Sequence, residues 1–357
     1  MLRFNRTQSG LLSLVALIIL FSCKPSAKLQ VLQPADLVIP EHIRKIVLID
    51  RSKPAGGFWS NVESVLTGEE YQQDKQGRRR AMEGLSELLQ KTPRFATIYS
   101  NVEMTGSKGG REFMTPLSWR EVEEICNKFG GDALVAIEMF DSDIESSTTS
   151  RSVKEKDKEG KEITRVVFDG RRRGTVKLGW RFYDPKDRTI VDEYRDNDTE
   201  EVTSSGAASQ QAATNNLRKS YELVRDIAFD LGGKYGKRIA PVWITLSRTY
   251  YKNIKGANED KFEQAARYAD AGEWAKAAEI WEKVASVRSN PDAAGKATYN
   301  LAVAAEVNGQ LNTALQYARD AYTQFSDKKA KNYIRLLEQR IQDLETIQRQ
   351  MHEKKTS

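Results

Sequence analysis

A recurring pattern near the carboxyl end constrains the fold of this chain more than any other feature. Small residues, aromatic residues and a glycine follow one another at the spacing of two packed helices joined by a turn. The two copies consist of Ala265, Tyr268, Gly272, Trp274, Ala277, Trp281 and Val284, and of Leu301, Ala302, Ala305, Gly309, Leu311, Ala314, Ala318 and Ala321. We therefore predict two successive helical hairpins, with the aromatic side chains filling the gaps between them.

This pattern resembles the tetratricopeptide repeat, although the turn glycines lie slightly further apart than the usual ~34 residues. Two repeats seldom fold alone, and residues 329–353 supply a terminal helix with apolar core spacing and a charged outer face. We predict an all-α repeat domain with this capping helix over residues 258–353; the alternative is a generic pair of helical hairpins. The resemblance implies a small concave surface that binds a protein or peptide. Its predicted lining is Tyr268, Trp274, Tyr299, Asn300 and Val303.

The amino-terminal segment predicts export. Residues 1–10 carry Arg3 and Arg6 and no acidic residue, and residues 11–21 form an apolar run too short to span a bilayer comfortably. The run ends in Leu-Phe-Ser-Cys at Cys23, which is followed at once by polar residues. This ending resembles the bacterial lipobox, in which the cysteine sulfur carries a diacylglyceryl group and becomes the first residue after cleavage.

The resemblance implies a signal peptide over residues 1–22 and a lipidated Cys23 that begins a tether over residues 23–42. An ordinary signal peptide with a chance cysteine, or an uncleaved short anchor, are the alternatives. The residues just after Cys23 contain no acidic cluster of the kind that resembles a surface-export signal. We therefore expect an anchor in the outer membrane, on its periplasmic face.

Residues 43–253 predict a mixed α/β domain. Runs typical of strands lie at 43–49, 95–99, 133–140, 175–182, 189–194 and 241–250, and helical spacing recurs at 78–90, 118–129 and 209–231. The order is β-α-β-α-β-β-β-α-β, with a polar connection up to Gly77 and with glycine pairs at 130–131 and 232–233 expected to end two helices. We expect 133–140 to be a central strand, and residues 145–162 to be either a long exposed hairpin or a disordered loop.

The fold class is therefore α+β, a small mixed α/β sandwich domain followed by the helical repeats. The domain resembles those of the curli-secretion channel subunit and the penicillin-binding-protein activator, on the residues 46–49, 131–135, 182–184 and 190–192. The whole layout resembles an uncharacterised family of tetratricopeptide-repeat lipoproteins from Bacteroidota. That resemblance implies placement and architecture, and it implies no activity.

The residues offer little material for catalysis. The chain has two histidines, His42 and His352, and two cysteines, Cys23 and Cys126. A Ser-His-Asp arrangement and a histidine-based metal site are therefore improbable, and we expect no catalytic residue, no cofactor and no metal. Cys126 falls on the apolar side of a predicted helix, where a buried and inert thiol is expected.

Charge gives a weaker signal. The net charge is +6, but lysine and arginine are interspersed with acidic residues, which is typical of a solvated surface and argues against nucleic acid as a partner. The arginine triplets at 78–80 and 171–173 stand out. They are either solvent-exposed or in contact with anionic headgroups or acidic glycans.

Taken together, these features predict a lipid-anchored, non-enzymatic envelope protein that binds a protein partner through its helical repeats. The alternative is a structural subunit of an oligomeric secretion or cell-wall assembly complex. A glycan hydrolase that uses paired carboxylates is a third hypothesis, although no residue pattern identifies such a pair. The partner and the oligomeric state stay open.

Overall fold

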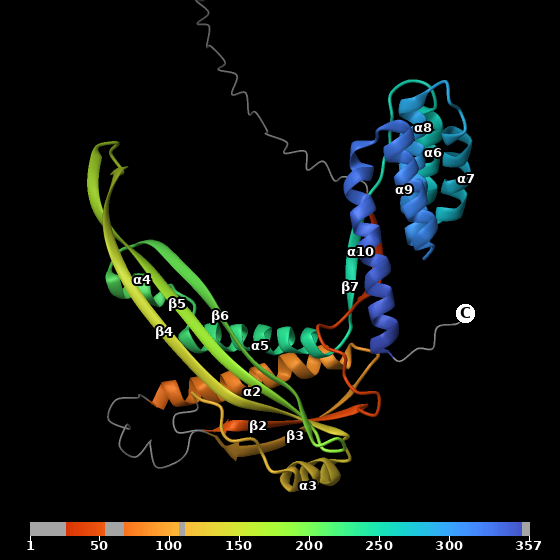
Figure 1. The fold of residues 1–357 in the computed structure, drawn as a ribbon. Coiled ribbons are helices and arrows are strands. Elements are labelled where there is room, and N and C mark those ends of the chain that lie inside the picture. Colours follow the sequence, from red (N-terminus) through yellow and green to blue (C-terminus); the bar gives the residue numbers. More distant parts are fainter. Residues whose placement is uncertain (1–25, 54–67, 107–110, 352–357) are drawn as a thin grey trace, which may run out of the picture. The chain divides into compact units, whose positions relative to one another are not determined.

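The computed structural model describes residues 26–53, 68–106 and 111–351, with only the backbone for 68–72 (Figure 1). The predicted signal peptide, Cys23 and His352 lie outside these residues. The described chain forms two compact units. The helical unit contains Leu246–Glu338 and the first residues up to Leu29, and the sheet unit contains Gln30–Thr245 and the residues from Gln339. The mixed α+β class, with a sheet domain before a helical region, is confirmed.

The sheet unit is built on five strands in the order β3-β2-β4-β5-β6. The strands are β2 (Lys45–Lys53), β3 (Ala96–Thr105), β4 (Ala133–Lys156), β5 (Glu162–Asp184) and β6 (Thr189–Ala207). β2 pairs in parallel with both β3 and β4, whereas β5 is antiparallel to β4 and β6. β4 is therefore the central strand, as its doubly apolar first half predicted.

Two apolar cores cover the two faces of this sheet, because neighbouring strand residues point to opposite sides. Ile46 and Leu48 pack with α2 (Gly68–Gln90) and α5 (Ser220–Ile239), whereas Val47 and Ile49 pack with α3 (Trp119–Phe129). The predicted capping box at the start of α3 is confirmed, with Ser118 and Glu121 bonded to each other's backbone. Gly130 ends this helix at a left-handed φ of 69°.

The second glycine pair was predicted wrongly as a helix end. α5 continues through Gly232 and Gly233 to Ile239, because these glycines lie where α5 crosses α2. A Cβ on Gly232 would stand 1.9 Å from the carbonyl oxygen of Ala81, and one on Gly84 would stand 2.1 Å from that of Phe229. The absence of a side chain lets the two backbones touch, so these glycines serve helix packing rather than chain termination.

Two other helix boundaries also differ from the prediction. α2 begins ten residues earlier than expected, with Gly77 inside it, because a Cβ there would stand 2.4 Å from the Phe140 ring. The predicted helix at 209–231 is broken into α4 (Gln210–Asn215) and α5. Ser209 caps α4 through a bond to the Ala212 amide, and the new helix starts only at Ser220.

The polar stretch at 145–162 forms a hairpin and not a loop. β4 and β5 pair continuously from Asp141 opposite Lys177 to Lys156 opposite Glu162. The turn closes through Asp157, whose side chain accepts from the Glu159 and Lys161 amides. The two strands extend beyond the helices of the sheet unit (Figure 1).

The predicted tether is corrected at its centre. Ser26–Gln33 form strand β1, which pairs with β7 (Val242–Thr249) in a two-stranded sheet. Ala27, Leu29 and Val31 alternate with exposed residues and are buried. This period of two was overlooked behind the proline-, serine- and alanine-containing composition. β7 was expected in the main sheet, and β1 is its partner instead.

The helical unit contains two helical hairpins and the start of a longer helix. The hairpins are α6 (Glu259–Asp270) with α7 (Trp274–Ala285), and α8 (Pro291–Val307) with α9 (Leu311–Phe325), and the last helix is α10 (Lys328–Gln350). Gly272 and Gly309 make the two tight turns, with φ of 81° and 77°. Among the described residues, no helix combines the length and apolarity needed to cross a bilayer.

Candidate functional site

The inner side of α8 was predicted to line a binding surface, and it is occupied by the chain itself. Asn300 is fully buried, and its amide brackets Tyr251: it accepts from the Tyr251 amide at 2.8 Å and donates to the Tyr251 carbonyl at 2.7 Å. Tyr299 is buried between the rings of Tyr251 and Tyr333, each at 5.4 Å between centroids, and Val303 is fully buried.

These three residues are therefore not available to a partner in this structure, and the prediction for them is wrong. The segment that follows β7 fills the face that a tetratricopeptide-like pattern leaves for a ligand. Below it, Glu306 is buried between Arg248, with a bond of 2.8 Å, and the Tyr333 hydroxyl, with a bond of 2.6 Å. Burial and this carboxylate raise the pKa of Tyr333, so its hydroxyl stays a donor.

The other two predicted residues are half-buried. Trp274 meets the ring of Tyr250 edge-on at 5.5 Å between centroids, and the Lys276 ammonium lies 5.5 Å from the ring centroid of Tyr268. Both residues belong to the first hairpin. They contribute to its packing, and the structure does not join them to Tyr299, Asn300 and Val303 in one open surface.

An open surface of the helical unit lies instead between α7 and α9. This α7–α9 groove has a volume of about 240 Å³, and its lining includes Glu282, Arg288, Tyr317, Asp320, Gln324 and Phe325. Arg288 donates to Gln324 at 3.0 Å and lies 4.9 Å from the Phe325 ring centroid. The groove thus combines aromatic surface with charges of both signs, which suits a polypeptide.

A second open surface lies in the sheet unit, between α2 and the edge strand β3. This α2–β3 cleft has a volume of about 350 Å³ and is lined by Leu48, Asp50, Lys75, Arg78, Arg79, Met82, Tyr99, Asn101, Val102 and Glu103. It opens at the carboxyl ends of the parallel strands β2 and β3. Ligands of open α/β sheets bind at this edge. The sequence analysis missed it because β3 and α2 meet only in three dimensions.

The two arginine triplets are not simply solvated. Arg78 is buried with its Nε on Asp50 at 3.0 Å, Arg79 is exposed beside Glu83, and Arg80 stacks 4.4 Å from the Phe229 ring centroid. In the second triplet, Arg171 pairs with Glu201, and Arg172 donates to Ser146 and to the carbonyl of Arg218. Only the first triplet contributes a buried guanidinium to an open cleft.

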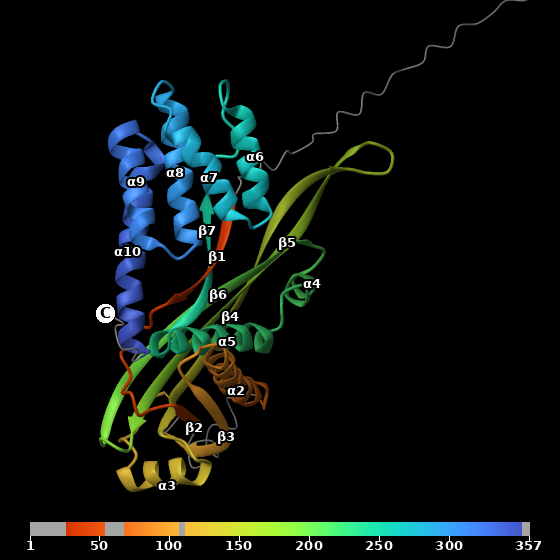
Figure 2. The same ribbon diagram turned by 90° about the vertical axis from the view of Figure 1, so that its right-hand side faces the viewer.

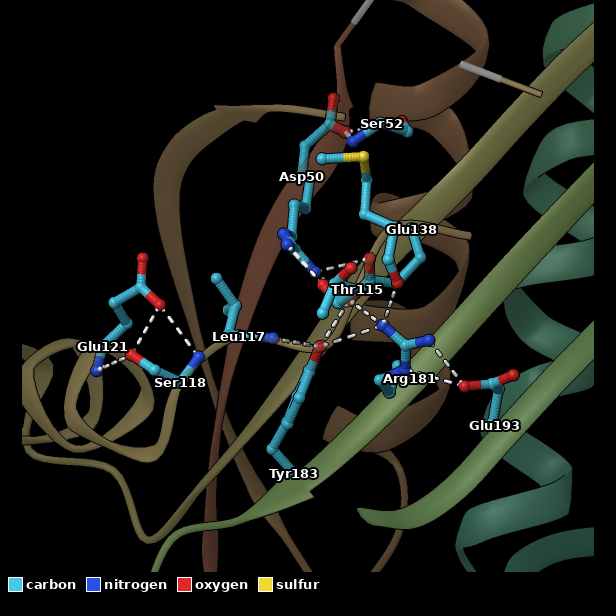
Figure 3. A network of polar contacts seen from close by, with 12 residues as sticks. Asp50, Ser52, Thr115, Leu117, Ser118, Glu121, Glu138, Arg181, Tyr183 and Glu193 are labelled. Carbon is cyan, nitrogen blue, oxygen red and sulfur yellow. Dashed lines mark hydrogen bonds and ion pairs between the residues drawn. The ribbon is translucent and has the colours of Figure 1, made fainter. Parts of the chain in front are cut away.

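A network of buried charges lies on the α3 side of the sheet (Figure 3). Glu138 of β4 accepts from Arg51 at 2.9 Å and from the Tyr183 hydroxyl at 2.6 Å, and it lies 3.2 Å from Arg181. Arg181 also bonds Glu193 at 2.6 Å. Each buried charge has an opposite partner, so the network balances itself and leaves no group free for substrate.

The same network fastens the segment before α3 to the sheet. Arg51 donates to the carbonyl of Thr115 at 2.7 Å, Arg181 donates to that of Met114 at 3.1 Å, and the Leu117 amide donates to the Tyr183 hydroxyl at 3.3 Å. Burial and the Glu138 carboxylate raise the pKa of Tyr183. The role that this geometry supports is the placement of Ser118 at the start of α3.

Cys126 is buried, as predicted, and burial raises the pKa of its thiol to about 12. A thiol of this kind is inert. His42 lies beside two aspartates that the sequence did not suggest: its Nε2 is 3.0 Å from Asp184, and each of His42, Asp184 and Asp187 offers a ligand atom within 4.8 Å of the others. Asp184 also accepts from the Lys186 amide, so its carboxylate closes the β5–β6 turn.

Two family models match this chain. The first is described as Domain of unknown function (DUF8603) and matches residues 43–251. The second is described as Domain of unknown function (DUF6340) and matches residues 263–345. No curated protein matches the chain.

Solved structures with related segments are distant. A putative neuraminyllactose-binding hemagglutinin homolog from Helicobacter pylori is 11% identical, with a TM-score of 0.25, over 56% of this chain and 81% of its own. A PelC dodecamer from Paraburkholderia phytofirmans is 7% identical, with a TM-score of 0.20, over 58% of this chain and 96% of its own. TM-scores this low carry no argument about fold or function.

Proposed function

This chain belongs to the family described as Domain of unknown function (DUF8603), and we propose that it is a lipid-anchored, non-enzymatic envelope protein that binds a protein partner through its helical unit. The observation that carries this proposal is the α7–α9 groove. It is open, it joins two hairpins, and it offers aromatic and charged groups together.

The repeat interpretation supports the same function. We interpret α6–α7 and α8–α9 as two tetratricopeptide-like repeats and α10 as their capping helix. Alanines that are fully buried hold the paired helices close, among them Ala265, Ala277, Ala302 and Ala314. Such arrays present side chains from successive hairpins to one ligand. Because the chain fills the inner face itself, we assign binding to the outer groove between α7 and α9.

Site-specific crosslinking in intact cells tests this assignment. A photocrosslinking amino acid replaces Gln324 in the α7–α9 groove, and the matched control carries it at Glu263, an exposed position on α6. We expect one discrete adduct from position 324 and none from position 263. Equal adducts at both positions, or none at either, would contradict the groove as the binding surface.

Lipid anchoring at Cys23 is a separate part of the proposal. The LFSC ending of the apolar run and the polar residues after it support an anchor in the outer membrane, facing the periplasm. Labelling with a palmitate analogue is expected to mark the wild-type protein, and Cys23→Ser is expected to abolish both the label and membrane retention. An unlabelled wild-type protein would rule out the anchor.

The alternative function, a subunit of an oligomeric secretion or cell-wall assembly complex, is favoured by one observation. Beyond Phe168 the β4–β5 hairpin is a two-stranded ribbon with mostly exposed residues on both faces. An isolated ribbon of this kind is marginal in water, and packing against another copy would stabilise it. Native mass spectrometry decides: a closed oligomer supports the alternative, and a monomer across micromolar concentrations eliminates it.

A further inference from the structure

Arg78 combines deep burial with unused hydrogen-bond donors. Its side chain is 4% exposed, and its Nε donates to Asp50 at 3.0 Å. The other oxygen of Asp50 accepts from the Ser52 amide and hydroxyl, so this carboxylate is held on both sides. Within the described ranges, the two terminal nitrogens of Arg78 have no hydrogen-bond partner, although the residue lines the α2–β3 cleft.

A guanidinium in this position is prepared to receive an anion. Asp50 fixes the plane of the guanidinium through Nε and leaves the Nη1 and Nη2 donors for a ligand. Those two donors match the spacing of two oxygens of a carboxylate or a phosphate. A buried guanidinium without such a partner keeps the full cost of its lost hydration.

Two more cations share this wall of the cleft. Lys75, Arg78 and Arg79 are spaced i, i+3 and i+4 along α2 and therefore lie on one helix face. Arg79 is paired with Glu83 at 3.0 Å, whereas Lys75 makes no ion pair with any described residue. Glu103 is the acidic lining residue that remains besides Asp50, so the cations outnumber the acids around the opening.

The opposite wall is shaped by an irregularity in β3. The β2–β3 register shifts between the Leu48–Tyr99 and Asp50–Glu103 pairs, and Asn101 in this bulge has a φ of 52°. Ser100 stabilises the bulge by donating to the carbonyl of Leu48 at 2.7 Å. A positive φ is unfavourable for a residue other than glycine, and here it brings the Asn101 amide to the cleft, as bulges beside binding sites do.

Tyr99 completes the polar lining. Its ring is 42% exposed, and burial of part of it raises the pKa of the phenol, which therefore stays a hydrogen-bond donor at neutral pH. Leu48 and Met82 supply apolar surface beside these donors. The volume of about 350 Å³ falls in the range of small-molecule pockets.

We propose that the α2–β3 cleft binds a small molecule through its carboxylate or phosphate group. The Nη donors of Arg78 grip two oxygens of that group, Lys75 adds an attractive charge, and Tyr99 and Asn101 donate from the opposite wall. Leu48 and Met82 accommodate the apolar part of the ligand. This site is independent of the partner groove in the helical unit.

Calorimetric titration of the purified chain tests the proposal, with inorganic phosphate and succinate as the two probes in chloride buffer. We expect saturable one-site binding of at least one probe, and the probe that binds identifies the recognised group. Arg78→Lys keeps a cation beside Asp50 but removes the two-pronged donor, and it is expected to weaken binding about tenfold.

Two further variants keep the test informative if Arg78→Lys fails to fold. Lys75→Gln removes an exposed charge and is expected to weaken binding about fivefold, whereas Lys91→Gln, on the same helix but outside the cleft, leaves it unchanged. All variants are first checked by circular dichroism. Absence of saturable binding for both probes overturns the proposal, and so does an equal affinity of the Lys75 and Lys91 variants.

Discussion

The helical unit and the sheet unit treat their most prominent surfaces in opposite ways. In the helical unit, Tyr251 and its neighbours fill the inner face of α8, and Asn300 holds them there with two backbone bonds. In the sheet unit, a bulge at Asn101 leaves the cleft beside α2 open. A repeating local pattern thus identifies the helices but not what covers them, because the covering segment comes from outside the repeat.

The largest effect is expected where α2 crosses α5, since this contact positions the α2 wall of the open cleft. Gly232→Val places a side chain against the Ala81 carbonyl and is expected to destabilise the sheet unit by about 3 kcal/mol or more. Denaturant unfolding measures this loss. Gly233→Ala is the control, because its Cβ would have its nearest neighbour 4.0 Å away. Similar losses in both variants would refute the close crossing.

Asn300→Ala tests the closed inner face of the helical unit. It leaves the buried amide and carbonyl of Tyr251 without partners, and we expect a loss of about 2–3 kcal/mol in that unit. Asn312→Ala, at an exposed position on α9, is expected to be neutral. A stable Asn300→Ala protein that had lost only its partner would instead restore Asn300 as a binding residue.

Asp74 gives the sheet unit a dependence on pH. Burial raises the pKa of this carboxyl from 3.8 to about 6, outweighing the opposing effects of Ser142 and Arg78. Because the folded pKa is the higher one, the neutral form contributes stability that is present below pH 4 and is lost as the pH rises through about 6.

We therefore expect Asp74→Asn to be more stable than wild type by about 1–2 kcal/mol at pH 7.5 and equally stable at pH 4. Unfolding curves recorded from pH 4 to 7.5 measure the difference. Asp143→Asn, in an exposed part of β4, is the matched control and should follow the wild-type profile. A constant difference at every pH would show that Asp74 titrates normally.

The smallest effect is expected at the start of α3. Ser118→Ala removes the bond from the Ser118 hydroxyl to the Glu121 amide and should cost about 1 kcal/mol. Bonds from Ser118 lower the pKa of Glu121, so this contribution is present above the ordinary carboxyl pKa and fades as the pH falls. Ser118→Thr, which retains a cap, should lose less; equal losses would refute the capping role.

The sequence predicted what depends on neighbouring residues. The central strand, the capping box and the helical hairpins follow from periodicity and from cap residues such as Ser118 and Gly130. The failures involve partners distant in the chain. Gly232 was interpreted as a helix end because its contact, Ala81, lies on another helix, and Asn300 was assigned to a ligand because Tyr251 could not be placed beside it.

The contrast between a filled inner face and an open sheet-edge cleft is the central claim, and hydroxyl-radical footprinting of the wild-type protein tests it most directly. Tyr99 is 42% exposed and Tyr299 is 5% exposed, and both are tyrosines of equal intrinsic reactivity. We expect rapid oxidation at Tyr99 and strong protection at Tyr299 in the same sample, read by mass spectrometry. Oxidation of Tyr299 at a rate equal to that of Tyr99 would contradict this account.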